Sequence, residues 1–422
     1  MKKTTFFIIF LLVSVWGLEV FSADRPNIII IGVDAMRADH MGAYGYPRNT
    51  TPNFDKLAEQ GVKFTDATSH IPLTNPSAAS FFTSLPPYKT GSVRNGIPVS
   101  KEVETLAGIL QRHGYTTVSV AGCAPLYHSR SGLHHGFDYW IDDGLFFMLE
   151  LNASIMTERA IEFFETELKE PFLFWTHFPD PHQPHRDYKG YSFKREPPPG
   201  IKGRNEIEDG YDSEIAYCDH HAQLILNVLE EKGYLDNALI IITSDHGEHL
   251  GGGGSPVGHG RLLYQSVLNV PLIMKGPGIE GGKTIDEPVQ LMDFAPTILS
   301  YAGIDAGENM MGRDLMPLIR NGVLPEPVPF YLETYSYMVP DIPIWKSAAK
   351  NSAPLLIGMR KGDYKIIYNF AGGKWELYNL AEDPHEKNNI FDKDTDKAEK
   401  MAHELGEWYE RRGRAEASLR MP

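Results

Sequence analysis

The chain has 422 residues, of which 42% are hydrophobic and 23% charged, and its formal net charge at pH 7 is −15. This composition is typical of a globular protein and excludes the collagen-like and wholly disordered classes. The net charge argues against nucleic acid or an anionic membrane surface as a partner, because both need a basic face.

Residues 1–23 have the pattern of a secretory signal peptide, in which a basic start is followed by an apolar run and small residues. Lys2 and Lys3 form the basic start, the apolar run covers residues 6–16, and the small residues end at Ala23. A membrane anchor is the alternative, but the run is short against the ~20 residues that a spanning helix needs. The sequence therefore predicts export to the periplasm or the exterior, with no stable membrane insertion.

Residues 24–325 are predicted to form alternating strands and helices. Asn27 to Val33 is a near-continuous apolar run, which is typical of a strand buried on both faces of a sheet. The alternation predicts an α/β fold with a mostly parallel central sheet flanked by helices. In chain order, the further predicted segments are helices over Thr51–Gln60 and Thr105–His113, a strand over Thr116–Ala121, a helix over Met156–Leu168, a strand over Phe172–Thr176, a helix over Asp212–Lys232, and strands over Ala238–Thr243 and Val270–Met274.

The pattern changes after Pro325, where short strands replace the alternation. A smaller C-terminal α+β subdomain is therefore predicted over residues 326–422, beside a catalytic domain over 24–325. The glycine run Gly251–Gly254 is predicted to be a mobile loop. The predicted C-terminal elements are strands over Phe330–Thr334, Leu356–Arg360, Tyr364–Tyr368 and Glu376–Tyr378, and a charged helix over about Asp394–Arg411.

Polar residues that suit a ligand site follow three of the predicted strands. In open α/β sheets the ligand lies beyond the carboxyl ends of the strands. Asp34 follows the first strand, His177 follows a later one, and Asp245 and His246 follow the strand at 238–243. A helix cap at Asp34 and a plain turn at Asp245 are the alternatives when each residue is taken alone. A carboxylate beside an imidazole suits a divalent cation, so we interpret the group as a metal site.

A helix start and two histidine-containing loops complete the polar candidates. Thr74 lies where a loop is predicted to enter a helix with Pro76 in its first turn. The unpaired N–H groups at such a helix start favour an anion. His182 lies in a second loop and His259 in a third, and a structural polar cluster or an exposed loop is the alternative for each.

In their order along the chain these segments resemble the sulfatase family, within the alkaline phosphatase superfamily. The resemblance extends from about Arg25 to the end of the chain, and each short motif is weak alone. The motifs that carry it are PNIIIIGVDAMRADHMGAYG, TPNFDKLA, GVKF, FTSLPPYKTG, HFPDPHQP, TSDHGE, VPLI, LMDFAPT and ELYNLAEDPHE.

The resemblance implies a role for each matching position. Thr74 stands where the family has its nucleophile, and His182 and His259 would contact the transferred group or protonate the leaving oxygen. The residues implied to hold one divalent metal ion are Asp34, Asp245 and His246. The residues implied to bind the substrate or its anionic group are Lys89, Arg94, Asn95, His177 and Arg261.

This chain departs from the family pattern in two places. Ordinary sulfatases have Cys or Ser followed by x-Pro-x-Arg and oxidise that first residue to formylglycine, whereas here Thr74 begins the segment and Ala78 replaces the arginine. No formylglycine is therefore expected. The family's adjacent pair of aspartates is reduced to Asp34 and Ala35. Calcium is the metal that the resemblance implies, with manganese or zinc as alternatives that suit a His ligand.

The sequence thus predicts an exported, metal-dependent, sulfatase-like hydrolase that cleaves sulfate or phosphate esters of a saccharide or small molecule through Thr74. A phosphodiesterase or phospho-group transferase of the same superfamily is the first alternative, and a catalytically inactive anion- or glycan-binding relative is the second. Specificity is expected in the segments Leu145–Asn152 and His185–Asp212 and in the C-terminal subdomain. The two cysteines, Cys123 and Cys218, are either one disulfide or two buried thiols.

Overall fold

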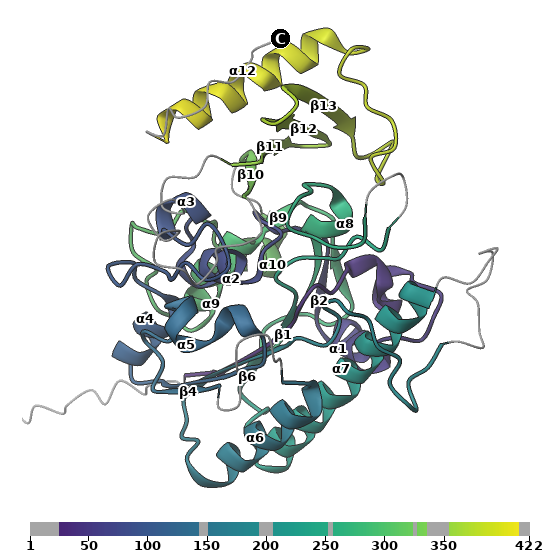
Figure 1. The fold of residues 1–422 in the computed structure, drawn as a ribbon. Coiled ribbons are helices and arrows are strands. Elements are labelled where there is room, and N and C mark those ends of the chain that lie inside the picture. Colours follow the sequence, from purple (N-terminus) through teal and green to yellow (C-terminus); the bar gives the residue numbers. More distant parts are fainter. Residues whose placement is uncertain are drawn as a thin grey trace, which may run out of the picture.

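The computed structural model describes residues 25–142, 151–193, 206–251, 256–323, 327–335 and 354–412 (Figure 1). The predicted signal peptide, most of the glycine run and much of the two segments expected to set specificity lie outside these residues. The described part forms a large sheet covered by helices and a second, smaller sheet at the C-terminal end.

The main sheet has nine strands in the order β4-β3-β5-β1-β6-β7-β2-β8, with β9 paired to β2. The strands from β4 to β6 are parallel, and β7 runs antiparallel to β6 and β2. The predicted mostly parallel α/β sheet is therefore confirmed. The strands are β1 (Asn27–Val33), β2 (Val62–Thr68), β3 (Thr116–Ala121), β4 (Tyr139–Ile141), β5 (Phe172–Phe178), β6 (Ala238–Thr243), β7 (Asn269–Lys275), β8 (Lys283–Ile285) and β9 (Val289–Gln290).

Helices cover both faces of this sheet, since successive residues of β1 point to opposite sides and all of them are buried. On one face Ile29 and Ile31 share a core with α1 (Pro52–Gln60), α6 (Ala153–Thr166) and α7 (Glu206–Glu231). On the other, Ile28 and Ile30 share a core with helices that follow β2 and β9. That second group comprises α2 (Thr74–Thr83), α4 (Leu106–Arg112), α9 (Phe294–Tyr301) and α10 (Met316–Asn321).

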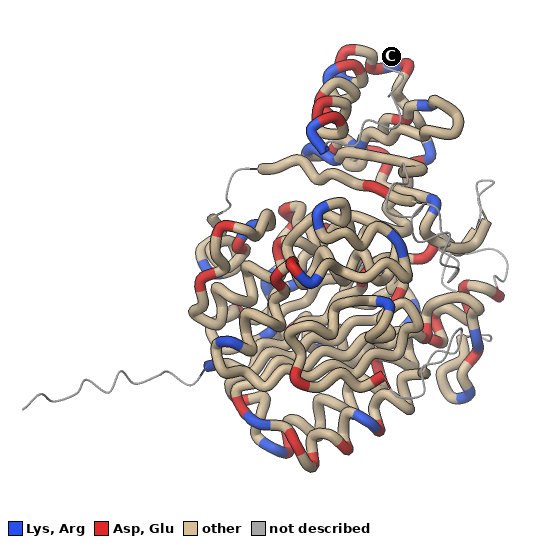
Figure 2. Tube along the Cα trace, turned by 60° about the vertical axis from the view of Figure 1, so that its left-hand side comes forward, with Lys and Arg blue, Asp and Glu red and all other residues tan. Residues whose placement is uncertain are grey.

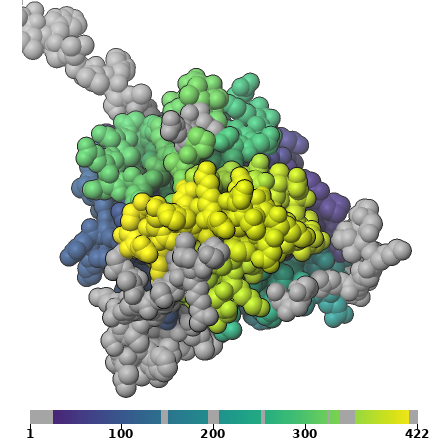
Figure 3. Space-filling model, turned by 90° about the horizontal axis from the view of Figure 1, so that it is seen from above, coloured from purple at the N-terminus to yellow at the C-terminus, as the bar shows by residue number. Residues whose placement is uncertain are grey.

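The C-terminal sheet is antiparallel, with the order β10-β11-β12-β13, as predicted. The long helix α12 (Thr395–Arg411) packs on it through Leu405, against Ile357 and Tyr368 of the sheet. Seen from above, this C-terminal part extends as a band across the molecule (Figure 3). Its strands are β10 (Phe330–Thr334), β11 (Leu356–Lys361), β12 (Tyr364–Asn369) and β13 (Lys374–Asn379).

Three elements differ from the predicted ones. The helix predicted from Asp212 begins at Glu206, and β5 continues to Phe178, so His177 lies inside the strand and not after it. Strand β2 was not predicted, because it is held by pairing with β7 and β8, which lie far later in the chain. Charged residues lie mainly on helices and loops, and no broad basic face is visible in Figure 2. Among the described residues, no helix is long and apolar enough to span a membrane.

Three short α-helices and four 3₁₀ turns complete the described elements. They are α3 (Pro87–Thr90), α5 (His128–Ser131) and α8 (Gln265–Leu268), with the 3₁₀ turns Ala38–His40, Gly42–Tyr44, Ala124–Leu126 and Leu291–Asp293.

Candidate active site

The three predicted metal ligands meet at the carboxyl ends of β1 and β6. These strands are adjacent and parallel, so the residues that follow them leave the same edge of the sheet. His246 Nε2 lies 3.6 Å from Asp34 Oδ1 and 3.4 Å from Asp245 Oδ2. All three side chains are buried, and their ligand atoms lie within 4.8 Å of one another. This is the spacing of groups that can share one cation.

The backbone after Asp34 is strained into the shape that this meeting requires. Ala35 has φ of 59°, a left-handed conformation that residues with a Cβ rarely adopt. Its N–H donates to Asp245 Oδ1 (3.2 Å), and its carbonyl accepts from the hydroxyl of Tyr211 on α7 (2.7 Å). The turn is thus held from both sides.

His246 presents a bare nitrogen to the two carboxylates. Its Nδ1 must donate to the carbonyl of Gly247 (3.0 Å), because a carbonyl can only accept, and this leaves Nε2 as a lone pair facing Asp34 and Asp245. Burial lowers the pKa of His246 to about 4, although the charge of Asp245 opposes the shift. A neutral imidazole whose second nitrogen is held by a carbonyl is the usual form of a metal-ligating histidine.

Asp245 has one oxygen that is satisfied and one that is not. Oδ1 accepts from the N–H groups of Ala35 and His246, whereas the buried Oδ2 has no hydrogen bond to any described residue. Burial opposes its charged form, but the nearby imidazoles of His246 and His177 outweigh it and hold the pKa of Asp245 well below its usual range. Two buried carboxylates and a nitrogen lone pair repel each other unless a cation lies between them, so a divalent metal ion fits this cluster.

Thr74 is the first residue of α2 and points its hydroxyl at the same cluster. Its Oγ1 lies 3.5 Å from His246 Nε2, and the side chain is buried. Two contacts hold the helix start in place. Ser77 donates its hydroxyl to the carbonyl of Asp245 (2.6 Å), and the N–H of Asn75 donates to Asn95 Oδ1 (3.0 Å). The predicted nucleophile and the predicted metal ligands therefore converge.

The imidazole rings of His182 and His259 lie next to each other, and that of His259 lies next to His246. Their ring centroids are 5.0 Å apart, and the ring of His259 lies 4.3 Å from that of His246. His259 Nδ1 lies 3.1 Å from Oε2 of Glu248, whose other oxygen accepts from Gln183 Nε2 (3.1 Å). Burial opposes the charge of Glu248, but the hydrogen bond with His259 outweighs it and lowers the pKa of Glu248. An ionised Glu248 makes His259 Nδ1 the donor and turns Nε2 away from the carboxylate.

The predicted anion-binding residues divide into buried and exposed ones. Arg94 is buried, and its Nε makes no hydrogen bond to any described residue. Burial lowers the pKa of its guanidinium. Asn95 holds the start of α2, as described above. Lys89 on α3 and Arg261 are exposed. Within the described ranges, neither side chain contacts the cluster of Asp34, Asp245 and His246.

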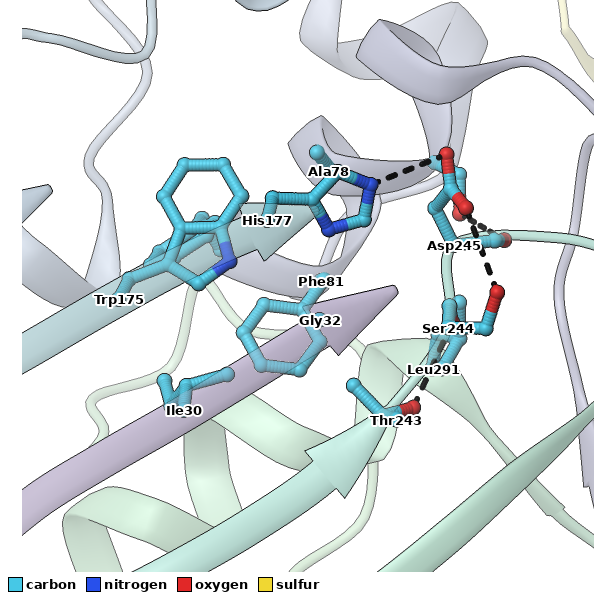
Figure 4. Close-up of a pocket in the computed structure, with 12 residues that line it drawn as sticks. Ile30, Gly32, Ala78, Phe81, Trp175, His177, Thr243, Ser244, Asp245 and Leu291 are labelled. Carbon is cyan, nitrogen blue, oxygen red and sulfur yellow. Dashed lines mark hydrogen bonds and ion pairs between the residues drawn. The ribbon is translucent and has the colours of Figure 1, made fainter. Parts of the chain in front are cut away.

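Ala78 borders a small buried cavity at the place where the family pattern has arginine. The cavity has a volume of about 20 Å³, roughly the space of one water molecule. Figure 4 shows His177 and Asp245 on one side of it, with Trp175 and Phe81 among its walls. His177 Nε2 lies 3.5 Å from Asp245 Oδ2. Burial lowers the pKa of His177, but the carboxylates of Asp245 and Asp34 outweigh it and raise that pKa.

Sequence reasoning assigned no role to Glu248, although it lies in the quoted motif TSDHGE. Its contact with His259 depends on a turn in which His249 and Gly258 pair as a bridge, which no local pattern indicates. In contrast, Asp180 is occupied structurally, since it accepts from Tyr188 Oη (2.7 Å) and from the N–H of Ala153 (2.8 Å). Neither cysteine forms a disulfide and both are buried, so the alternative of one disulfide is wrong.

Residues 26–304 match the family model Sulfatase, and residues 258–413 match a model described as N-sulphoglucosamine sulphohydrolase, C-terminal. The described residues form an α/β fold with a cluster of possible metal ligands at the strand ends. The first match covers well over half of the chain, and the chain therefore belongs to the sulfatase family, a family of sulfuric ester hydrolases. The resemblance and the enzyme class predicted from the sequence are thus confirmed.

Two relatives align along most of the chain. An N-acetylglucosamine-6-O-sulfatase of Bacteroides thetaiotaomicron is 26% identical over 87% of the chain and 83% of its own length. An ulvan-active sulfatase of Formosa agariphila is also 26% identical, over 87% of the chain and 78% of its own length.

Solved structures share the fold. One is a protein in complex with its substrate D-glucosamine-2-N,6-O-disulfate, with a TM-score of 0.73, 24% identity and coverage of 93% of the chain and 99% of that chain. Another is a phosphonate monoester hydrolase of Agrobacterium radiobacter, with a TM-score of 0.75, 20% identity and coverage of 92% and 96%.

Proposed function

We propose that the protein is an exported, metal-dependent sulfatase that cleaves a sulfate ester of a saccharide, with Thr74 as its nucleophile. The observation that carries this proposal is the position of the Thr74 hydroxyl, 3.5 Å from His246 Nε2 and on the same side as Asp34 and Asp245. Saccharide substrates are proposed because the relatives that align along most of the chain are named for them. Export rests on the signal-peptide pattern of residues 1–23.

Asp34, Asp245 and His246 would hold the divalent ion beside Thr74. The ion supplies positive charge, which lowers the pKa of a nearby hydroxyl and neutralises the charge of a tetrahedral anion. The chain's own contribution is to bring four groups together from two strand ends and a helix start, in a buried place where electrostatic interactions are strong.

The start of α2 is proposed to bind the sulfuryl group. Its N–H groups and dipole face an anion that approaches Thr74. Asn95 fixes the position of the helix start through its contact with Asn75. Arg94, the residue before Asn95, adds a buried guanidinium. This arrangement aligns the sulfur with the hydroxyl and excludes bulk water.

The reaction proceeds in two steps in this proposal. Deprotonated Thr74 Oγ1 attacks the sulfur, its proton having passed to solvent, and the bond from sulfur to the sugar oxygen breaks. His259 gives the proton on Nε2 to that departing oxygen. In the second step His259 takes a proton from water, which attacks the sulfur of the threonyl sulfate and frees inorganic sulfate and Thr74.

A phosphate or phosphonate ester is the second candidate substrate, and the residue Thr74 itself favours it. Formylglycine releases sulfate by elimination from its hydrate, whereas a threonyl ester must be hydrolysed directly, and phosphoryl esters of hydroxyl groups are often hydrolysed in this way. The transferase alternative predicts transfer of a phospho-group to an acceptor other than water. The inactive alternative predicts anion or glycan binding without turnover.

The experiment is a comparison of ester classes with purified protein that has been stripped with EDTA and reloaded with one metal at a time. Nitrophenyl sulfate, nitrophenyl phosphate, a phosphonate monoester and sulfated N-acetylhexosamines are offered to the wild type and to Thr74→Ala. Metal-dependent release of sulfate by the wild type alone supports the proposal. Release of phosphate but not sulfate supports the second candidate, and the absence of turnover with every metal and ester overturns both.

A further inference from the structure

A second imidazole, that of His177, borders the cluster of Asp34, Asp245 and His246. His177 lies near the end of β5, which pairs with β1 so that His177 is opposite Gly32. The imidazole lies over Gly32, since a Cβ built on that glycine would be 2.2 Å from His177 Nδ1. Glycine at this position therefore gives the ring room to turn its Nε2 toward Asp245 (Figure 4).

Two buried atoms face each other there without a hydrogen bond. His177 Nε2 and Asp245 Oδ2 are 3.5 Å apart, both side chains are more than nine-tenths buried, and neither atom has a hydrogen-bond partner among the described residues. Unsatisfied buried polar atoms are rare in folded proteins, because leaving such an atom without a partner is energetically costly. A cation in contact with both atoms would remove that cost.

The geometry of the neighbouring groups extends this pair into one donor set. A nitrogen of His177 lies within 4.8 Å of a carboxylate oxygen of Asp34 and of the sulfur of Cys123, and Asp34 also belongs to the second group, with Asp245 and His246. The distance of 3.5 Å from His177 to Asp245 Oδ2 is close to the 3.4 Å from His246 to the same oxygen. Both imidazoles therefore stand in the same relation to the carboxylate that the ion must contact.

Resting on the function proposed above, we propose that His177 is a further ligand of the ion, and that the ion is zinc or manganese and not calcium. Calcium takes hard oxygen ligands, usually six to eight of them, whereas imidazole favours first-row transition metals. Two imidazoles and two carboxylates in a dry pocket form a donor set that calcium would fill poorly. The absence of the family's second aspartate, at Ala35, removes one more oxygen ligand.

The side chain at position 78 makes room for this arrangement. An arginine there would bring a fixed cation into the cavity that borders His177 and Asp245. A cation in this place would repel a divalent ion and compete with it for Asp245 Oδ2. Ala78 brings no cation into the cavity, so the carboxylate of Asp245 remains available to the metal and to His177.

The test measures metal identity and affinity directly, without reference to turnover. Protein stripped with EDTA is dialysed against equal concentrations of zinc, manganese and calcium, and the bound metals are counted by mass spectrometry. We expect about one transition-metal ion per chain and little calcium. X-ray absorption at the zinc edge of the wild type should count two imidazole ligands, and this measurement does not depend on any variant.

The variant His177→Gln completes the test, with His221→Gln as the matched control. His221 is a buried histidine on α7 whose ring contacts Tyr217 (centroids 4.4 Å apart) and lies apart from the cluster. His177→Gln should weaken zinc binding by at least about tenfold, in the range seen when the surroundings of a metal ligand are removed. His221→Gln should bind zinc as the wild type does.

Each outcome separates this inference from the proposed function. Retention of calcium, a count of one imidazole, or unchanged zinc affinity in His177→Gln overturns the inference and leaves the sulfatase proposal standing. Two imidazoles and a weakened variant support the inference even if no ester is cleaved, in which case the proposed function alone fails.

Discussion

Charged side chains are buried both at the strand ends of the main sheet and beneath the C-terminal sheet, but their partners differ. In the C-terminal region Lys365 is fully buried and lies 2.5 Å from Glu386, and Arg412 lies 2.5 Å from buried Glu333. Each buried charge there meets an opposite one. At the strand ends the nearest groups to Asp245 Oδ2 are the imidazoles of His177 (3.5 Å) and His246 (3.4 Å), and not a lysine or arginine among the described residues.

The two regions differ in whether their buried charges are balanced within the chain, and this difference indicates which region has a structural role and which a functional one. A buried pair of opposite charges needs nothing further and fixes the position of one element on another. Lys365 and Glu386 do this for the small sheet, because Glu386 also accepts from the N–H of Gln265 on α8 (2.5 Å). A buried group of carboxylates and lone pairs is complete only with a cation from outside the chain. Changes in the first region should therefore alter stability, and changes in the second should alter binding and turnover.

The largest expected effect is that of Thr74→Ala. Loss of the hydroxyl removes the nucleophile, so kcat should fall by at least about 10⁴-fold while the fold and the metal content stay as in the wild type. Steady-state kinetics and metal analysis check this together. Thr83→Ala changes a threonine at the other end of α2 and serves as the control, which should retain kcat. Retained turnover in Thr74→Ala would show that another group attacks the ester.

Lys365→Met should destabilise the protein by about 3–5 kcal/mol, because it leaves the carboxylate of Glu386 buried without its cation. The double variant Lys365→Met/Glu386→Met should recover most of that loss. Chemical denaturation measures the free energy of unfolding, and kcat per folded molecule should stay within about twofold of the wild type. A loss of kcat with unchanged stability would contradict the division drawn between the two regions.

Glu248→Gln should act on the leaving group more than on the nucleophile. If Glu248 holds His259 as a proton donor, the variant should lower kcat about 10²-fold for sugar sulfates, whose leaving oxygen is a poor one. Nitrophenyl sulfate has an acidic leaving group that departs without a proton, so its kcat should change little. An equal loss for both substrates would indicate that Glu248 only supports the local fold.

The smallest of the expected effects is the increase in the free energy of unfolding when the metal ion binds. At a free ion concentration ten times Kd, one site contributes about 1.4 kcal/mol, which a thermal unfolding scan detects as a rise of a few degrees in Tm. The double variant Asp34→Asn/Asp245→Asn should lose this rise. The Lys365→Met/Glu386→Met variant should keep it, and loss of the rise there would link the two regions energetically.

The sequence predicts those parts of the fold that depend on local pattern. Strand β1 was predicted with its observed bounds, because its near-continuous run of isoleucine and valine is typical of a strand buried on both faces. Strand β2 was missed because it gains its stability from β7, which lies about two hundred residues later in the chain. Strand ends likewise indicated Asp34, Asp245 and His246, since parallel strands bring their ends together.

Tertiary contacts explain the rest of the site. The part played by Glu248 arises from a loop that folds back on itself, and the orientation of His177 depends on Gly32 in the neighbouring strand. Lys89 and Arg261 matched the family pattern, but the fold leaves both exposed. Motif position therefore identified candidates, whereas burial and the direction of the side chain distinguish among them.

The most direct measurement is a crystal structure of the metal-loaded protein with bound sulfate, with anomalous data collected at the absorption edge of the metal. One metal peak should lie between Asp34, Asp245 and His246, and the sulfate sulfur should lie within about 3–3.5 Å of Thr74 Oγ1, the separation of reacting atoms before attack. A metal peak away from these three residues, or a sulfate on the far side from Thr74, would contradict the account.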